Sequence, residues 1–219
     1  KSVEFGYHSA IVKEPNQTKW VQVDLGSATN LRRVVLRPCH DDFNNIGGGF
    51  GFPVRFKVEG ASTADFKNPV SIGDETQADF PNPDIAPVGF TTKAKARFIR
   101  ITATRLAKRS NDYILAISEL EALDATGKNV ARNAKVSSPD SIEAPKRWRR
   151  ANLTDGIYPV AGDESAIAQM QEVTRQRQTI LAKLQTPERK AKRKQIQTDL
   201  AAAQKSLKAL PSGKMVYAA

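Results

Sequence analysis

The densest group of side chains that could bind or react lies in residues 37–52, which combine charges, amides, an imidazole and two phenyl rings among glycines. Arg, Asp or Asn groups can hold pairs of sugar hydroxyls, and an aromatic ring can cover the apolar face of a pyranose. The segment therefore has the composition of a sugar-binding loop. A hydrogen-bonded turn with Phe50 and Phe52 in the core explains it equally well. The candidate ligand contacts are Arg37, His40, Asp41, Asp42, Asn44 and Phe50.

A second polar segment, residues 108–113, follows a later strand. Arg109, Asn111 and Tyr113 could face the first group across a shallow pocket, although a buried ring also explains Tyr113. Tyr7 and His8 lie near the start of the chain, and a surface histidine without a role is the simpler interpretation of His8. Loops carry most binding residues in folded domains, so these segments are the predicted site.

The sequence contains little that favours catalysis. His8 and His40 are its two histidines, neither G-x-S-x-G nor H-E-x-x-H occurs, and Asp41 and Asp42 are neighbours rather than a spaced acid/base pair. Cys39 is the single cysteine, which excludes an internal disulfide and a cysteine-based zinc site. A thiol nucleophile beside His40 is conceivable, but a packed thiol at a strand end is simpler. We therefore expect a noncatalytic module.

The elements that must position these loops alternate apolar and polar residues, as half-buried strands do. A strand over residues 20–26 is predicted to end at Gly26 before a turn. Segments rich in Pro, Asn and Asp separate the strands. The pattern predicts a mainly β fold, an antiparallel sandwich or jelly roll. The other clear strands are residues 31–36, 54–59 and 96–103.

From Asp163 onward the apolar spacing changes to about 3.5 residues, which predicts two helices. Thr186, Pro187 and Glu188 between them provide an N-cap, a proline for the first helical position and an acid for the helix dipole. A short connection favours antiparallel neighbours. We therefore predict an antiparallel coiled-coil hairpin over residues 159–211. A tail follows over 212–219, with an extended strand at 214–219.

Charge divides the chain. Residues 1–126 carry 16 Lys and Arg against 15 Asp and Glu, whereas residues 127–219 carry 18 against 8, which leaves a net charge of +10 in the second part. A basic surface can bind nucleic acid or another polyanion, and the run at 146–150 adds Trp148 as a stacking ring. A solvated cationic surface is the preferred interpretation, so nucleic acid is disfavoured as a partner. The apolar runs are too short to cross a bilayer, so no membrane insertion is expected.

The motifs WVQVDLG at 20–26, LRRVVLR at 31–37, FPVRFKVEG at 52–60, ARFIRITATRL at 96–106 and ISELEAL at 117–123 resemble the discoidin, or coagulation factor 5/8 C-terminal, family. The resemblance covers about residues 5–126. It implies a galactose-binding-like jelly-roll β-sandwich with a ligand site on loops at one end. It also implies that Trp20 and Asp24 are structural, and that the two polar segments lie near the same rim.

One departure from the family order concerns its opening motifs. Family members begin with an N-A-x-x-A-x-x-S-S strand and an L-x-D-G loop upstream of the tryptophan, whereas similar motifs occur here downstream, at 129–138 and 152–156. Either a second copy is truncated after its start, or a circular permutation lets residues 129–158 complete one sandwich over 1–158. We favour permutation, because nothing after residue 158 resembles a second tryptophan strand and the ends of a jelly roll lie close together.

The resemblance also implies a structural calcium ion near the L-x-D-G segment and the last strand. Asp155 and either Glu119 or Glu121 would be the matching donors, since calcium prefers hard oxygen ligands. A turn role for Asp155 is the simpler alternative.

The order of motifs along nearly the whole chain also resembles a segment of large exported planctomycete proteins that carry a cytochrome-c-like module elsewhere. The chain starts at Lys1 without a signal sequence, so we expect an excised extracytoplasmic module whose partners are glycans, including anionic ones, and neighbouring domains of the parent protein. Three hypotheses follow: a carbohydrate-binding module, a structural scaffold without a small ligand, and a polyanion-binding domain.

Overall fold

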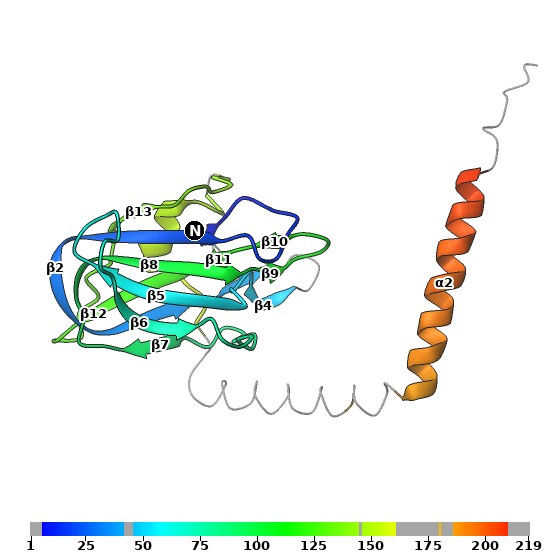
Figure 1. Cartoon of the computed structure of the whole chain (residues 1–219), viewed down its shortest axis with the longest axis horizontal. Helices are drawn as coiled ribbons and strands as arrows, with labels where there is room; N and C mark the ends of the chain where they lie inside the picture. Colours follow the sequence, from blue (N-terminus) through cyan, green and yellow to red (C-terminus); the bar gives the residue numbers. More distant parts are fainter. Residues whose placement is uncertain (1–5, 42–45, 145, 161–179, 181–185, 210–219) are drawn as a thin grey trace, which may run out of the picture. The chain divides into compact units, whose positions relative to one another are not determined.

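The computed structural model describes residues 6–41, 46–144, 146–160, 180 and 186–209, and the chain divides into two compact units, Lys1–Ala161 and Gly162–Ala219 (Figure 1). The first unit holds the β-structure and a short 3-10 helix, η2 (Arg150–Thr154), and the second holds helix α2 (Pro187–Ala209). The strands of the described residues, in chain order, are β1 (Tyr7–His8), β2 (Lys19–Arg37), β3 (Cys39–Asp41), β4 (Gly47–Phe50), β5 (Arg55–Ala61), β6 (Val70–Glu75), β7 (Val88–Thr91), β8 (Lys95–Arg105), β9 (Ala107–Lys108), β10 (Tyr113–Ile114), β11 (Ala116–Ile117), β12 (Glu119–Asp124) and β13 (Lys135–Ser137).

Strand β2 connects the two layers of the sandwich. Its first part pairs with β8 and β13, and its second part pairs with β12 and β7, all antiparallel. The sheet continues from β8 to β5 and β6. The sequence prediction of a strand that ends at Gly26 is wrong. The chain bends there within β2, because Gly26 adopts a φ of 81° that glycine tolerates without a Cβ clash, and the pairing register shifts after Asp24.

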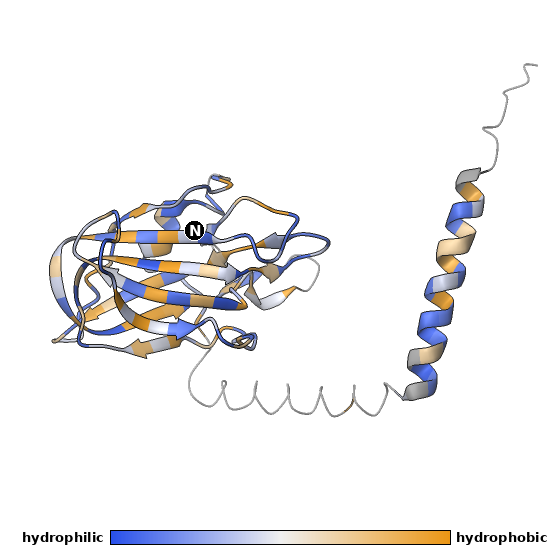
Figure 2. Cartoon of the chain, viewed as in Figure 1, coloured by the Kyte–Doolittle hydropathy of each residue, from blue (hydrophilic) through white to orange (hydrophobic). Residues whose placement is uncertain are grey.

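The core follows from the alternation predicted for the strands. In β5, Phe56 and Val58 are fully buried between the half-exposed Arg55, Lys57 and Glu59. Figure 2 shows the same alternation of hydrophilic and hydrophobic residues along the strands. Each fully buried aliphatic or aromatic side chain stabilises the fold by about 1.5–3 kcal/mol of transfer free energy. The predicted mainly β, jelly-roll class is confirmed.

Residues 129–158 belong to the same unit as the strands before them. Strand β13 pairs with β2 through Lys135 opposite Asp24 and Ser137 opposite Gln22. Ala131 and Leu153 are fully buried in the main core. This is the arrangement that the permuted alternative expects. The permutation itself, and the division at residue 158, stay predictions.

The second unit contributes one described helix. Thr186 Oγ1 accepts a hydrogen bond from Arg189 N at 3.3 Å, so the predicted N-cap and the proline at the first helical position are confirmed. Ile196, Leu200 and Leu207 are exposed on α2. The first predicted helix, apart from residue 180, and the tail lie outside the described residues, so the coiled-coil hairpin stays a prediction. None of the helices in the described part of the chain is long and apolar enough to cross a membrane.

Asp140 joins three segments of the first unit. Its Oδ1 accepts a hydrogen bond from Ala10 N at 2.7 Å, its Oδ2 pairs with the Lys19 ammonium, and its backbone oxygen accepts from Tyr7 Oη at 3.1 Å. The Lys19 side chain is 6% exposed. Burial raises the pKa of Tyr7, so its hydroxyl stays protonated as a donor. Asp140 thus fastens residues 129–158 to the start of the chain.

We expect Asp140→Ala to lower the free energy of unfolding by about 3 kcal/mol, because removing one partner leaves the buried Lys19 charge uncompensated. Urea unfolding measures the change. The control is Asp65→Ala, whose side chain is 51% exposed beside Lys67 and which we expect to cost much less, because solvent screens an exposed ion pair. Equal losses in the two variants would contradict the role given to Asp140.

Candidate functional site

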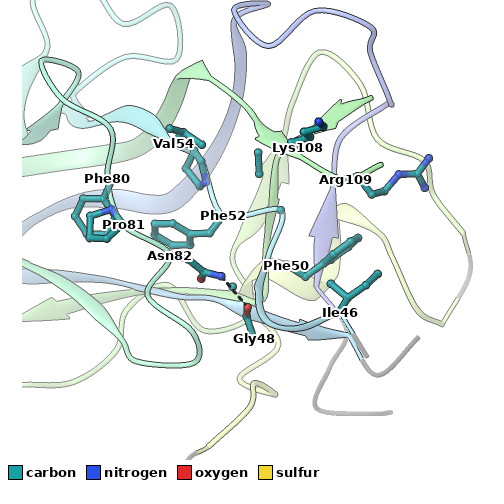
Figure 3. Close-up of a pocket in the computed structure, with 14 residues that line it drawn as sticks. Ile46, Gly48, Phe50, Phe52, Val54, Phe80, Pro81, Asn82, Lys108 and Arg109 are labelled. Carbon is teal, nitrogen blue, oxygen red and sulfur yellow. Dashed lines mark hydrogen bonds between the residues drawn. The ribbon is translucent and has the colours of Figure 1, made fainter. Parts of the chain in front are cut away.

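A pocket of about 310 Å³ lies beside β4 and β9 (Figure 3). Figure 1 shows that β4, β9 and β10 lie at the same end of the sandwich. Three stretches line the pocket: Ile46 with residues 48–54, residues 80–82, and residues 107–109. The first and third belong to the two polar segments singled out in the sequence. We call this cavity the rim pocket.

Two glycines allow the segment after Pro81 to approach β4 closely. A Cβ on Gly48 would overlap the Asp84 carboxylate, and one on Gly49, whose φ is 73°, would overlap the Asn82 amide. Because neither glycine has a Cβ, Asn82 Nδ2 can donate a hydrogen bond to Gly48 O at 3.2 Å, the dashed line in Figure 3. Asn82 is not among the predicted ligand contacts, and the Phe-Pro-Asn-Pro run at 80–83 is the sequence signal that marks its loop.

Phenyl rings form the apolar wall of the rim pocket. Phe52 packs edge-to-face on Phe56, with ring centroids 5.5 Å apart, and lies 5.9 Å from Phe80. Phe50 is 8% exposed and Phe52 is 4% exposed, yet both line the pocket. A core position and a place in the pocket wall, the two alternatives for these rings, are therefore compatible. Both rings pack in hydrophobic clusters, and both also line the cavity.

The polar side chains of the lining are Asn82, Lys108 and Arg109. Arg109 pairs in bidentate fashion with Asp112, through Nε to Oδ1 at 2.9 Å and Nη2 to Oδ2 at 2.8 Å. The guanidinium holds the pKa of the Asp112 carboxyl below its usual range. Of the predicted ligand contacts, the structure brings Phe50 and Arg109 together in one pocket.

Two other candidates lie in ion pairs away from the pocket lining. Arg37 contacts Glu121 Oε2 through Nε and Nη2, each at 2.8 Å, and its guanidinium lies 4.3 Å from the centroid of the Tyr158 ring. Asp41 is 5% exposed and pairs with Arg147. These contacts hold β2 and β3 against residues 147–158.

The remaining candidates are spread around the same loops. His40 lies half-buried in β3, opposite Gly48 in the strand register. Asn111 is exposed in the turn between β9 and β10, and Tyr113 packs partly against the main core while its backbone exchanges hydrogen bonds with Val12 at 2.9 and 3.0 Å. Asp42 and Asn44 lie outside the described residues. Cys39 is fully buried, so the packed thiol predicted for it is confirmed.

Trp148 and His8 support the pocket from behind. Their rings are 5.3 Å apart, and each contacts Phe50, at 5.6 Å from Trp148 and 5.8 Å from His8. His8 is 3% exposed, so its interpretation as a surface histidine is wrong: the Phe50 and Trp148 rings cover it. Trp148 is 5% exposed and Arg150 pairs with Glu143, so this ring does not present a stacking surface for a base.

Burial lowers the pKa of His8, with Arg109 acting in the same direction and the Ser9 carbonyl, Asp41 and Asp112 opposing it. Nδ1 lies 2.6 Å from Ser9 O, as expected if it donates its proton there in the neutral ring. The folded protein therefore binds this proton less tightly than the unfolded chain, whose histidine titrates near pH ~6.5. The neutral ring stabilises the fold above that pH, and this stability is lost as the pH falls.

We therefore expect the free energy of unfolding to decrease from pH 7 to pH 5, and part of the decrease to disappear in His8→Gln. Urea unfolding at pH 7, 6 and 5 measures both proteins, and the difference between them isolates His8 from the carboxylates that titrate in the same range. A difference that stays constant with pH would refute the assignment. His40→Gln serves as the matched histidine control.

Two of the residues named for calcium lie on adjacent segments. Glu119 is fully buried in β12, and its Oε1 accepts a hydrogen bond from Gly156 N at 2.9 Å, so the turn that carries Asp155 lies against β12. Asp155 Oδ1 accepts from Ile157 N at 3.0 Å, so the simpler turn role is also present. Carboxylate oxygens suit calcium, so Glu119 and Asp155 would supply two of its ligands, whereas the Glu121 carboxylate holds Arg37. The described residues hold no group of three or more metal-binding side chains, so backbone oxygens would complete the shell.

We expect calcium to raise the melting temperature of the chain, because an ion that binds only the folded state stabilises it by about 2.7 kcal/mol at 100 times its Kd. Differential scanning calorimetry in 5 mM CaCl2 and in EGTA measures the shift, and Glu119→Gln should remove it. Glu143→Gln, a change of the same type on an exposed glutamate, should leave it intact. Superimposable wild-type transitions would exclude a calcium site.

The strand order and the rim pocket together define a β-sandwich module with a recessed site on the loops at one end. The model of the F5/8 type C domain matches residues 6–120, and the chain belongs to this family. A search of curated proteins finds no match.

Several solved structures are similar to part of the chain. Chitosan-binding module 1 of a chitosanase/glucanase from Paenibacillus sp. IK-5 is 18% identical, with 51% of this chain and 73% of that chain covered and a TM-score of 0.38. CBM32-1 from a family 31 glycoside hydrolase of Clostridium perfringens is 15% identical, with 52% and 73% covered and a TM-score of 0.38. The lectin domain of lectinolysin, complexed with Lewis B antigen, is 21% identical, with 54% and 70% covered and a TM-score of 0.36.

Proposed function

We propose that this chain is a noncatalytic carbohydrate-binding module of a larger exported protein and that it binds a glycan in the rim pocket. One observation carries the proposal. Phe50 and Arg109 come from two segments that were selected for sugar-binding composition and lie far apart in the sequence, and both line the same cavity. Membership of the F5/8 type C family agrees with a site on these loops.

The chemistry of the pocket suits one sugar ring. Ligand pockets commonly measure about 300–1,000 Å³, and the rim pocket, at about 310 Å³, lies at the low end of that range. Ile46 and Pro81 are exposed, and with the parts of Phe50 and Phe52 that border the cavity they offer apolar surface to the carbon face of a pyranose. Asn82, Lys108 and Arg109 offer N–H donors to its oxygens. A longer glycan would contact Asn111, which is exposed in the adjoining turn, and the exposed part of Tyr113 after it.

The lining also supports binding without catalysis. Glycoside hydrolysis generally uses a pair of carboxyl groups on either side of the scissile bond. Among the described residues that line the rim pocket none carries a carboxyl group. The charged side chains there are Lys108 and Arg109.

A glycan-binding module acts where polysaccharides occur, which supports an extracytoplasmic location. The neighbouring domains of the parent protein are then the other partners. Nucleic acid is a poor fit as a ligand of the first unit, because the ring of Trp148 is buried and the cations on either side of it, Arg147 and Arg149, hold Asp41 and Asn152.

A scaffold role is the second candidate, and α2 is the observation that favours it. Ile196, Leu200 and Leu207 are each more than half exposed on that helix. Apolar surface of this kind marks an interaction site when it is contiguous. A module whose sandwich bound no ligand would act through this face.

We expect Ala107→Trp to abolish glycan binding, because Ala107 lines the rim pocket from β9 and an indole there occupies the volume of the ligand. A glycan array with neutral, uronic-acid and sulfated polysaccharides, read at 0.15 M NaCl, identifies the ligand. Titration calorimetry then measures an affinity loss of more than about tenfold, equivalent to about 1.4 kcal/mol.

The control is Ala125→Trp, which adds the same ring to the exposed turn after β12. It should bind like the wild type and melt at the same temperature. Loss of binding in both variants, or retention in both, would disprove a ligand site in the rim pocket. An array without any bound glycan would favour the scaffold.

A further inference from the structure

We propose that the sugar bound in the rim pocket is acidic, a uronic acid or a sulfated sugar, and that Lys108 is the residue that binds its negative charge. The inference rests on the proposed function and specifies its ligand class. It follows from the hydrogen-bond donors and acceptors of the pocket lining that the protein's own contacts leave free.

The two cations of the lining differ in how far their charge is already balanced. Arg109 gives two of its five N–H groups to Asp112, whose carboxylate balances its charge, and Asn82 gives one to Gly48 O. Lys108 is exposed on β9, and within the described part of the chain no carboxylate pairs with it. An ammonium group has three N–H donors and no acceptor. Lys108 is therefore the cation of the described lining whose charge is left for a ligand to balance.

Several hydrogen-bond acceptors of the lining already take part in internal contacts. Asn82 Oδ1 accepts from Asp84 N at 2.9 Å. Three backbone oxygens also accept: Gly49 O from Phe52 N at 3.0 Å, Gly51 O from Ala116 N at 2.8 Å, and Val54 O from Phe80 N at 2.7 Å. The described lining thus offers a ligand the cationic donors of Lys108 and Arg109 and contains no carboxylate acceptor.

Acidic and neutral sugars differ in the hydrogen bonds that they make. The hydroxyl groups of a neutral sugar both donate and accept, and a lining without a carboxylate offers their donors only neutral amide and backbone oxygens. A carboxylate or sulfate group only accepts, and hydrogen bonds to a charged group are stronger than neutral ones. The lining therefore favours an acidic sugar over its neutral counterpart.

The geometry of the pocket agrees with this division of roles. Figure 3 shows Lys108 and Arg109 on one side of the pocket and Phe80, Pro81 and Asn82 on the other, with the Phe52 ring between them. A sugar ring lying against the phenyl groups would direct its acidic substituent toward β9. Asp112, the carboxylate nearest in sequence, is held by Arg109 and its charge is balanced there.

The experiment compares polygalacturonate with its fully methyl-esterified form, and dextran sulfate with dextran, by titration of the full chain at 0.15 and 0.5 M NaCl. We expect each acidic polymer to bind at least about tenfold more tightly than its neutral partner. Lys108→Gln should reduce the affinity for the acidic polymer about tenfold and leave any binding of the neutral polymer unchanged.

The matched control is Lys95→Gln, which removes the same charge from an exposed lysine at the first residue of β8. Because β8 leads to the pocket through its last residue, Arg105, and a strand rises about 3.3 Å per residue, Lys95 lies roughly 33 Å from that end. We expect Lys95→Gln to bind like the wild type. An equal loss in both variants would mean general attraction to polyanions and would overturn the inference.

Two further outcomes distinguish the acidic-ligand inference from the proposed glycan-binding function. Equal affinity for neutral and acidic polymers, unaffected by Lys108→Gln but abolished by Ala107→Trp, would overturn the acidic ligand and keep the glycan-binding pocket. Binding to none of the four polymers, together with an empty glycan array, would overturn both.

Discussion

The antiparallel pairing of β2 is the constraint on which the first unit depends. This one strand of 19 residues forms ladders with β8 and β13 in its first part and with β12 and β7 in its second. Both layers are therefore registered against the same segment, and the bend at Gly26 sets the angle between them. The end of β2 leads through Pro38 directly into β3, which begins the rim. Any slip in the ladder would exchange buried and exposed faces and would displace the loops.

The rim pocket is built by close approaches rather than by regular structure. Glycines at 48 and 49 bring β4 against residues 82 and 84, and Gly51, with a φ of 69°, packs on Ala116 of β11. Behind this wall Trp148 and His8 pack on Phe50. Trp148 comes from residues 129–158, outside the stretch that the family model matches. The late segment thus contributes to the site as well as to the sandwich, and Asp140 keeps it in place.

The sequence predicted the parts of this molecule that depend on local pattern. Period-2 alternation identified the core strands, and side-chain composition identified both segments that line the pocket. Partners fixed by long-range register were beyond its reach. Arg37 reaches Glu121 only because β12 pairs with β2. Asp41 and Arg147 are 106 residues apart, and no local pattern around either residue predicts that they form an ion pair. The burial of His8 and Trp148 was not predicted for the same reason. The two rings cover each other and pack on Phe50, and the three residues are far apart in the sequence.

Charge distribution determines how selective such a module can be. Residues 1–126 are nearly neutral, and most of the net charge of +11 lies after residue 127, in part on α2. Charge on that helix attracts any polyanion over about 8 Å, the Debye length at physiological ionic strength, without regard to its stereochemistry. Selectivity must then come from short contacts, in which the geometry of one sugar ring against Phe50, Phe52 and the β9 cations decides the affinity. In the rim pocket, whose charged side chains are Lys108 and Arg109, a single accessible ammonium such as Lys108 has more influence on ligand choice than the same charge would have within a basic surface.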